Sequence, residues 1–304
     1  MDLRSLRYFV RVVEFGSLTR AAAHLHIAQP ALTRHIQRLE EEFGATLLQR
    51  ASRGVTVTDA GELLYRRGAE LLRDAERLRD ELLDHGGQPA GRVVVGITAA
   101  ACPIFAPPLL QRIRAHFPRI SVKISEGFSN VLGAWLVNGE IDVGILSDRD
   151  IPHGLHATSI AQEELLFLSQ PGRANASWIP IDELLATPLI LTDGIQKRME
   201  TILSAPVVVD MKLNSVEVIR HLVQNGLGVS ILPYSATRDE ILSGALQAFR
   251  IGESGLSRHL TVCTSETRRV STATGIVVET LASISAELVA AGHFTYEPAR
   301  LPQS

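Results

Sequence analysis

The sequence predicts a winged helix-turn-helix, then one long helix, then a two-lobed α/β domain that takes up the rest of the chain. Three observations predict this class. Apolar residues recur at helical spacing through the first 60 residues and lead into a short β-prone hairpin. A charged segment with leucines at heptad spacing follows. Beyond residue 91, apolar strands alternate with helices. A chain of 304 residues has room for two or three domains of roughly 100–200 residues each.

The composition excludes several classes of protein. The net charge of −3 means that any contact with nucleic acid must be local. Cys102 and Cys263 belong to no CxxC motif and to no Cys/His cluster, which argues against a zinc site and a disulfide scaffold. The segment Met1–Arg4 opens no apolar signal region, and no run approaches the about 18 apolar residues of a membrane span. We therefore expect a protein of the reducing cytoplasm that does not enter the membrane.

The first 60 residues predict three short helices and a wing. Apolar side chains at i, i+3, i+4 and i+7 mark the first helix: Leu6, Phe9, Val10 and Val13. Gly16 breaks this pattern, and Ser17 is a good N-cap for a second helix that runs through three alanines to Leu25. The third helix has Pro30 in its first turn and stops at Gly44. The β-prone runs 46–50 and 54–58 then form a hairpin.

The third helix, within AQPALTRHIQRLE, has two different faces. Leu32, Ile36 and Leu39 fall on one side and predict a face turned to the core. The opposite side carries Thr, Arg and Gln side chains, which donate and accept hydrogen bonds.

A fourth helix is expected from about Ala60 to Leu83, capped by Thr58 or Asp59. Its apolar residues fit heptad a and d positions: Leu64, Leu71, Ala75, Leu78 and Leu82. It is either an amphipathic helix that packs on its own domain or a helix that forms a dimer; we favour the dimer, because little else nearby can cover the stripe. Gly68 weakens a continuous zipper. The glycine-containing stretch 85–91 is a linker.

The remaining chain predicts two α/β lobes with a cleft between them. Expected strands are 92–97, 121–126, 142–146, 165–168, 189–191, 207–210, 229–232 and 260–264, and expected helices are 104–117, 129–138, 215–224 and 274–291. Because strands and helices alternate, we expect parallel sheets.

At this point the chain resembles the LysR-type transcriptional regulators over essentially its full length. The motifs that carry the resemblance are FGSLTRAAAHLHIAQPALTRHIQRLEEEFGATLLQR (15–50), VTVTDAGELL (55–64) and NGEIDVGIL (138–146). It implies a DNA-binding domain at 1–59, a linker helix and hinge at 60–88, and an effector domain of periplasmic binding protein type at 89–304. Lobe I would comprise about 91–161 and 267–295, and lobe II about 162–266.

The resemblance also implies a function. Such a regulator binds promoter DNA as a homodimer or homotetramer, senses a small molecule between its lobes, and changes DNA bending or its contact with RNA polymerase. We expect no enzymatic activity, no cofactor and no metal. Two positions depart from the family pattern: Ala28 lacks a frequent serine hydroxyl, and Leu48 replaces a frequent phenylalanine.

The polar face of the third helix supplies the chemistry that reads DNA. Arg pairs with guanine, Gln with adenine, and Thr contacts a thymine methyl or a phosphate. The residues expected at DNA are Gln29, Pro30, Ala31, Thr33, Arg34, Gln37, Arg38, and Arg50 and Arg53 on the wing. Eight arginines and six acidic residues in 1–60 leave a modest positive excess, with Glu40–Glu42 at the far helix end. An ordinary solvated face remains the alternative.

The effector site is expected where strands end and helices begin, since free backbone N–H groups there favour anions. The candidates are Thr98, Ala99, Ala100, Ser129, Asn130, Ser147 and Thr192. The methyl groups of 99–101 suit an apolar part of the ligand, and a carboxylate suits the helix ends. Ser129 as a simple N-cap and Thr98 as a simple loop residue remain open, and Lys197 and Arg198 are more often solvated than used as a clamp.

Two other functions compete with a regulator. One is an enzyme with an appended DNA-binding head, but GxSxG, HExxH and P-loop motifs are missing from the sequence. The other is a solute-binding transport component, which would lack residues 1–60 and carry a signal peptide.

Overall fold

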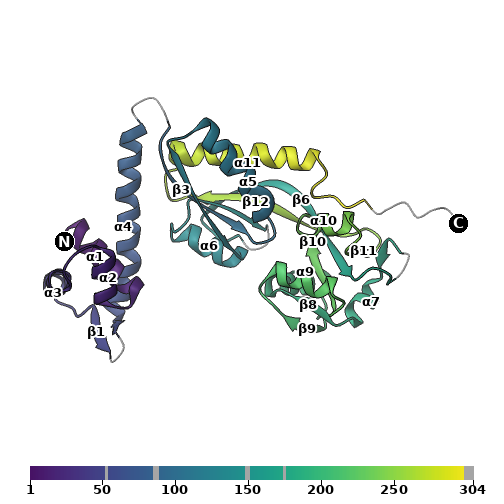
Figure 1. Cartoon of the computed structure of the whole chain (residues 1–304), viewed down its shortest axis with the longest axis horizontal. Helices are drawn as coiled ribbons and strands as arrows, with labels where there is room; N and C mark the ends of the chain where they lie inside the picture. The colour runs from purple at the N-terminus through teal and green to yellow at the C-terminus, as the bar shows by residue number, and fades with distance from the viewer. Residues whose placement is uncertain (52–53, 85–88, 148–150, 174–175, 298–304) are drawn as a thin grey trace. The chain divides into compact units, whose positions relative to one another are not determined.

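The computed structural model describes residues 1–51, 54–84, 89–147, 151–173 and 176–297. Of residues 50, 51, 77 and 80–84 it describes the backbone alone. The chain divides into two compact units, Met1–Leu83 and Asp84–Ser304 (Figure 1).

The N-terminal unit is built on the three expected helices, α1 (Leu3–Phe15), α2 (Leu18–His24) and α3 (Gln29–Phe43). The Asp2 carboxylate caps α1 by accepting from the Ser5 N–H, and the Ser17 hydroxyl caps α2. The helices share one core: Phe9, Val12, Ala21, Ala22, Leu32, Ile36, Leu39 and Leu47. The predicted core face of α3 is therefore confirmed.

The wing consists of β1 (Leu48–Ala51) and β2 (Gly54–Val57), paired antiparallel as expected. Its position depends on the end of α3, because Glu40 Oε1 accepts from the backbone N–H groups of Leu47 (2.8 Å) and Leu48 (3.1 Å). The Val55 N–H donates to the Gly16 carbonyl at 3.1 Å. A Cβ on Gly54 would lie 2.3 Å from that carbonyl oxygen, so only glycine permits this close approach.

Helix α4 (Asp59–Asp84) follows, and Thr58 Oγ1 caps it by accepting from the Gly61 N–H at 3.0 Å. One face packs within the unit: Leu64 and Leu72 lie with Leu6 and Val10 of α1. At Gly68 a Cβ would lie 2.5 Å from Leu6 Cδ1.

The expected heptad seam of α4 is therefore split between two faces. Leu64 belongs to the core of the unit, and Gly68 is the point of close helix contact there, which corrects its interpretation as a weak zipper position. Leu71 and Leu78 lie elsewhere and remain 50 % and 58 % exposed. Leu82 falls among residues whose side chains are not described.

The second unit contains one continuous mixed sheet in the order β4-β3-β5-β12-β6-β10-β8-β9, and β11 and β7 extend it beside β6. Its strands are β3 (Gly91–Thr98), β4 (Ile120–Gly127), β5 (Val143–Ser147), β6 (Leu155–Ser169), β7 (Trp178–Ile179), β8 (Leu189–Leu191), β9 (Val209–Lys212), β10 (Val229–Pro233), β11 (Gln247–Ile251) and β12 (Leu256–Ser265). Its helices are α5 (Cys102–His116), α6 (Ser129–Val137), α7 (Ile181–Ala186), α8 (Asp193–Leu203), α9 (Val216–Gln224), η2 (Tyr234–Ala236), α10 (Arg238–Leu242) and α11 (Thr272–Ala290).

Two lobes share this sheet. In lobe I, α5 and α11 cover one face of β3 and β5, and α6 covers the other (Figure 1). Lobe II has its own clusters on either face of β8 and β10. Helix α11 is long and apolar enough to cross a membrane by length and composition alone, although polar residues and two glutamates interrupt its apolar sequence. It packs Val277, Leu281 and Ile284 into the lobe I core.

The expectation of parallel sheets holds for part of each lobe and is wrong for β6 and β12, since β6 pairs antiparallel with β10 and β11, and β12 pairs antiparallel with β5. β3 pairs parallel with β4 and β5, and β8 pairs parallel with β9 and β10. Two long strands, β6 and β12, run antiparallel to each other through both lobes. The short apolar runs 165–168 and 260–264 mark only the buried halves of these strands, since their other halves are polar and half-exposed.

A buried ion pair lies where β6 and β12 cross from one lobe to the other. Arg258 Nε and Nη2 each lie 2.8 Å from Glu163 Oε2. The Ser235 N–H donates to Glu163 Oε1 at 3.1 Å, so both carboxylate oxygens have partners. Glu163 is fully buried and Arg258 nearly so.

We expect Glu163→Ala to lower the free energy of unfolding by about 3–5 kcal/mol, because it leaves the Arg258 charge buried without its carboxylate. Glu183→Ala, which breaks the exposed pair with Arg173, is the control and costs below about 1 kcal/mol. Urea denaturation of the full chain measures both. Equal costs for the two variants would contradict the structural weight given to the buried pair.

Candidate functional site

The outer face of α3 presents most of the predicted DNA contacts to solvent. Gln29, Pro30, Arg34, Gln37 and Arg38 are exposed. Ala31 and Thr33 are half-buried, and Thr33 Oγ1 donates to the Gln29 carbonyl at 3.0 Å. The threonine hydroxyl is therefore held by its own helix in the free protein, which leaves its methyl group as the freer contact.

The start of α3 depends on its backbone. Ala28 is the N-cap and contributes no side-chain cap among the described contacts, and proline follows in the first turn. Free N–H groups at a helix N-terminus bind phosphate oxygens.

The charges around α3 are divided by role. The acids near its C-terminal end take part in local structure, since Glu40 holds the wing and Glu42 pairs with the N-terminal amino group of Met1. Within the described chain, no ion pair occupies Arg34 or Arg38. Two cations therefore project from the face that carries the glutamines. Arg50 lies on β1 with its side chain outside the description, and Arg53 lies outside the described residues.

In the second unit, several predicted effector residues gather at the C-terminal ends of β3 and β5. These strands are parallel neighbours, with Ile97 opposite Ile145, so Thr98 and Ser147 end the two strands side by side. A Cβ on Gly96 would contact Leu132 of α6, and by strand alternation Thr98 faces the same helix. Ser129, the first residue of α6, accepts from the Ser147 N–H through its Oγ at 3.1 Å.

Thr98 is buried, and its hydroxyl has no hydrogen-bond partner among the described residues. Buried hydroxyl groups usually have partners, so an orphaned one beside a helix start is a candidate ligand contact.

Arg198, a possible clamp residue of a type more often solvated, lies against this group in the structure. Lys197 is exposed as expected, but the Arg198 side chain is buried, and its Nη1 donates to Ser147 Oγ at 2.8 Å. This contact joins α8 of lobe II to β5 of lobe I. The signal was present in the sequence: position 198 follows Ile195 by three residues and adjoins Met199, and both are core residues.

The other predicted residues lie around this group without joining it. Thr192 is buried, and its hydroxyl caps α8 by accepting from the Ile195 N–H at 3.2 Å. Ala100 is buried, Ala99 half-buried and Asn130 exposed. Among the described contacts, no hydrogen bond joins Thr192 or Asn130 to Ser147.

Both thiols are poor nucleophiles. Burial raises the pKa of Cys263 to about 12. Burial, and then the negative charge of Glu126, raise the pKa of Cys102, which opens α5. Within the described ranges, no three His, Cys, Asp or Glu side chains gather as metal ligands do.

Family models match both units. The model described as "Bacterial regulatory helix-turn-helix protein, lysR family" matches residues 3–62, and that described as "LysR substrate binding domain" matches residues 86–284. The chain belongs to the LysR family of transcriptional regulators. It is therefore a ligand-responsive DNA-binding regulator, with the helix-turn-helix in the first unit and the substrate-binding domain in the second.

Individual members of the LysR family resemble it along most of their length. The nitrogen assimilation regulatory protein nac of Escherichia coli (strain K12) is 32 % identical over 259 residues, 82 % of this chain and 83 % of that protein. A full-length OxyR variant from Pseudomonas aeruginosa is 26 % identical, with a TM-score of 0.69 and 94 % of each chain covered. CbnR in complex with its target DNA shares the fold, with a TM-score of 0.69 at 22 % identity over 93 % of this chain and all of that one.

We expect both native thiols of this LysR regulator to resist alkylation by iodoacetamide at pH 8. A pKa of about 12 leaves about one Cys263 thiolate in ten thousand at that pH, and alkylation requires the thiolate. Mass spectrometry of the native chain should find Cys263 unmodified and Cys102 modified slowly, whereas both react readily in guanidinium. Rapid native modification of Cys102 would contradict its raised pKa.

Proposed function

We propose that the chain controls promoters by inserting α3 into the major groove of DNA. The observation that carries this proposal is the division of α3 into a buried apolar face and an exposed face with two glutamines and two arginines that form no ion pair within the described residues. In this arrangement Gln29, Thr33, Arg34 and Gln37 contact base edges, since residues in the N-terminal half of a recognition helix reach them. Pro30 and Ala31 lie against the DNA backbone, and Arg38 binds phosphate. On sequence grounds the wing residues Arg50 and Arg53 hold phosphate or enter the minor groove.

The regulator acts as a homodimer or homotetramer, with α4 as the dimer contact. Support comes from two leucines on a helix whose other face is already covered. Leu71 is half exposed, and Leu78 is more than half exposed. Two DNA-binding units in one particle bind with avidity, which makes up for the modest positive charge of each.

The effector binds between the lobes, at the ends of β3 and β5. Thr98, Ser129 and Ser147 supply polar contacts, the methyl groups of Ala99 and Ala100 meet an apolar part, and Asn130 and Thr192 stand at the flanking helix starts. Arg198 belongs to the same group because it joins Ser147 from the other lobe. The α6 N-terminus favours a small molecule with a carboxylate.

Effector binding shifts the balance between lobe arrangements, and this changes DNA bending and contact with RNA polymerase. The protein performs no catalysis in this scheme, needs no cofactor and works in the cytoplasm. The domain limits expected from the sequence, 1–59, 60–88 and 89–304, remain our proposal for how these roles divide along the chain.

The DNA contact is tested by gel shifts on the chain's own upstream DNA at several salt concentrations. Arg34→Ala should cost about 1–3 kcal/mol of binding and relax discrimination between operator variants, because it removes a base contact. Arg38→Ala should weaken binding to all sequences alike and lower the salt slope by about 1. Arg112→Ala, in the second unit, is the control. An unchanged affinity and footprint for Arg34→Ala would refute the groove assignment.

The effector site is tested by thermal shift of the full chain against a panel of small carboxylic acids and their amides. A binding acid raises the unfolding midpoint by mass action, and its amide does so less. Thr98→Val, which has nearly the same shape, should abolish the shift while leaving the midpoint of the unbound protein unchanged or higher, since the native hydroxyl has no described partner. A full shift in Thr98→Val would remove this residue from the site.

A further inference from the structure

The segment that follows α11 connects the two lobes a third time. We call residues Gly292–Tyr296 the strap. The strap begins in lobe I, where Phe294 is buried in the core cluster of β3, α5 and α11. Its ring stacks on Phe105 of α5 with 6.2 Å between ring centroids. The first end of the strap is therefore held by lobe I.

The other end of the strap is held by lobe II. Tyr296 is buried in the cluster of Leu166, Leu232 and Ala248. Its ring lies 5.7 Å from that of Tyr234, and its hydroxyl donates to the Ala248 carbonyl at 3.1 Å. Burial, and then the neighbouring Tyr234, raise the pKa of Tyr296, so the hydroxyl stays a donor at neutral pH.

Polar contacts hold the backbone of the strap along β6. The Glu164 N–H donates to the Phe294 carbonyl at 3.1 Å. Arg250 of β11 donates from Nη2 to the Tyr296 carbonyl at 2.7 Å and lies 3.4 Å from the Glu164 carboxylate. The strap, Glu164 and Arg250 are thus all in contact with one another. Glu164 is the neighbour in β6 of Glu163, which forms the buried pair with Arg258.

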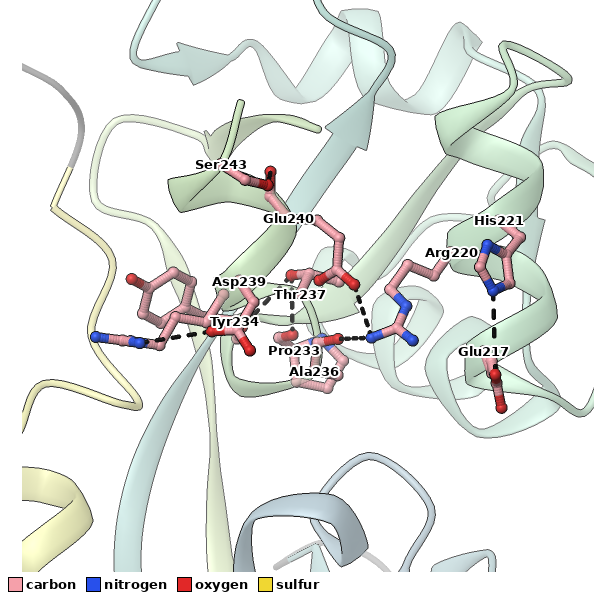
Figure 2. A network of polar contacts seen from close by, with 11 residues as sticks. Glu217, Arg220, His221, Pro233, Tyr234, Ala236, Thr237, Asp239, Glu240 and Ser243 are labelled. Atoms are coloured by element: carbon pink, nitrogen blue, oxygen red, sulfur yellow. Dashed lines mark hydrogen bonds and ion pairs between the residues drawn. The ribbon is translucent and has the colours of Figure 1, made fainter. Parts of the chain in front are cut away.

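The lobe II side of this attachment is itself braced. Figure 2 shows Tyr234 at the start of η2, beside a network that ties η2 and α10 to α9. There Arg220 donates to the Ala236 carbonyl at 3.3 Å and pairs with Glu240 at 2.9 Å (Figure 2). Tyr296 therefore packs against a part of lobe II that these contacts hold together.

The two anchors leave the strap no slack. Phe294 and Tyr296 are separated by one residue, and an extended chain advances about 3.3–3.6 Å per residue. Their Cα atoms can therefore be no more than about 7 Å apart. Any rotation of the lobes that separates the two anchors must pull one aromatic ring out of its core.

We propose that the strap is a conformational restraint that limits how far the lobes can rotate about the β6–β12 crossover. The substrate-binding family model ends at residue 284, so this element lies outside the matched domain. The inference goes beyond the proposed function, since it concerns the geometry of the lobes alone and is testable without effector or DNA. With the strap in place, a ligand must shift the lobes within a narrow range or pull out an anchor.

The test is a distance distribution between spin labels on the lobes of the full chain. The labels are placed at the exposed positions Ala186 on α7 and Ala282 on α11, in a Cys102→Ser/Cys263→Ala background. Two glycines inserted after Thr295 keep both anchors but lengthen the tether by up to about 7 Å. We expect the distribution to broaden by several ångströms, up to about that length.

The matched control carries the same two glycines between Gly292 and His293, outside the two anchors. This variant should keep the distance distribution of the parent protein, because Thr295 alone still separates Phe294 from Tyr296. Equal broadening in both insertion variants, or no broadening in either, would overturn the proposal.

Point variants keep the test decisive if the insertion impairs folding. Tyr296→Ala removes the lobe II anchor and should broaden the distribution, whereas Tyr296→Phe keeps the ring and should broaden it less. Leu189→Ala truncates a buried side chain of lobe II that lies away from the strap contacts, and it should lower the melting temperature without broadening. A parent-like distribution for Tyr296→Ala, or equal broadening for Leu189→Ala, would refute a specific role of the strap.

Discussion

The effector-binding unit depends on two strands that belong to both lobes at once. β6 and β12 remain paired through the crossover, with one register shift at Leu260/Thr261. A buried charged pair near one end of this ladder needs partners for its carboxylate, since an uncompensated buried charge costs several kcal/mol. Glu163 meets this demand with Arg258 on one oxygen and the Ser235 N–H on the other. The Ser235 contact also holds η2 against the crossover.

The contacts between the lobes follow from this crossover. Because β3 and β5 are anchored to β12, their C-terminal ends lie at a constant place beside the N-terminus of α6. Arg198 reaches that place from lobe II, and the strap joins the lobes near the crossover itself. In the function proposed above, an effector alters the first contact, and in the proposed restraint the strap limits how far the lobes can then rotate.

The N-terminal unit solves a different problem, which is to present a polar helix face on a very small core. In this unit, glycines let backbone segments pack closely against their neighbours, in addition to the contacts between large apolar side chains. Gly54 lies against the Gly16 carbonyl, and Gly68 packs against the Leu6 side chain. A Cβ added at Gly61 would lie 2.1 Å from the Leu47 carbonyl oxygen. The Glu40 carboxylate completes the arrangement by holding the first residues of the wing. The apolar face of α3 is held by the core of the unit, and its Arg and Gln side chains lie on the exposed face.

The sequence by itself determined the helices of the first unit, the buried face of α3, the exposed Arg and Gln of the opposite face, and most strands of the lobes. These features depend on periodicity and capping within a few residues, so they can be read locally. The sequence also indicated Thr98, Ser129 and Ser147 as candidate effector contacts, because the ends of strands and the starts of helices are local signals. Only the tertiary structure decided the rest. Arg198 and Ser147 are 51 positions apart, and Glu163 and Arg258 are 95 apart. A polar side chain is buried only where a distant partner repays its lost hydration, and that partner is known only once the chain has folded.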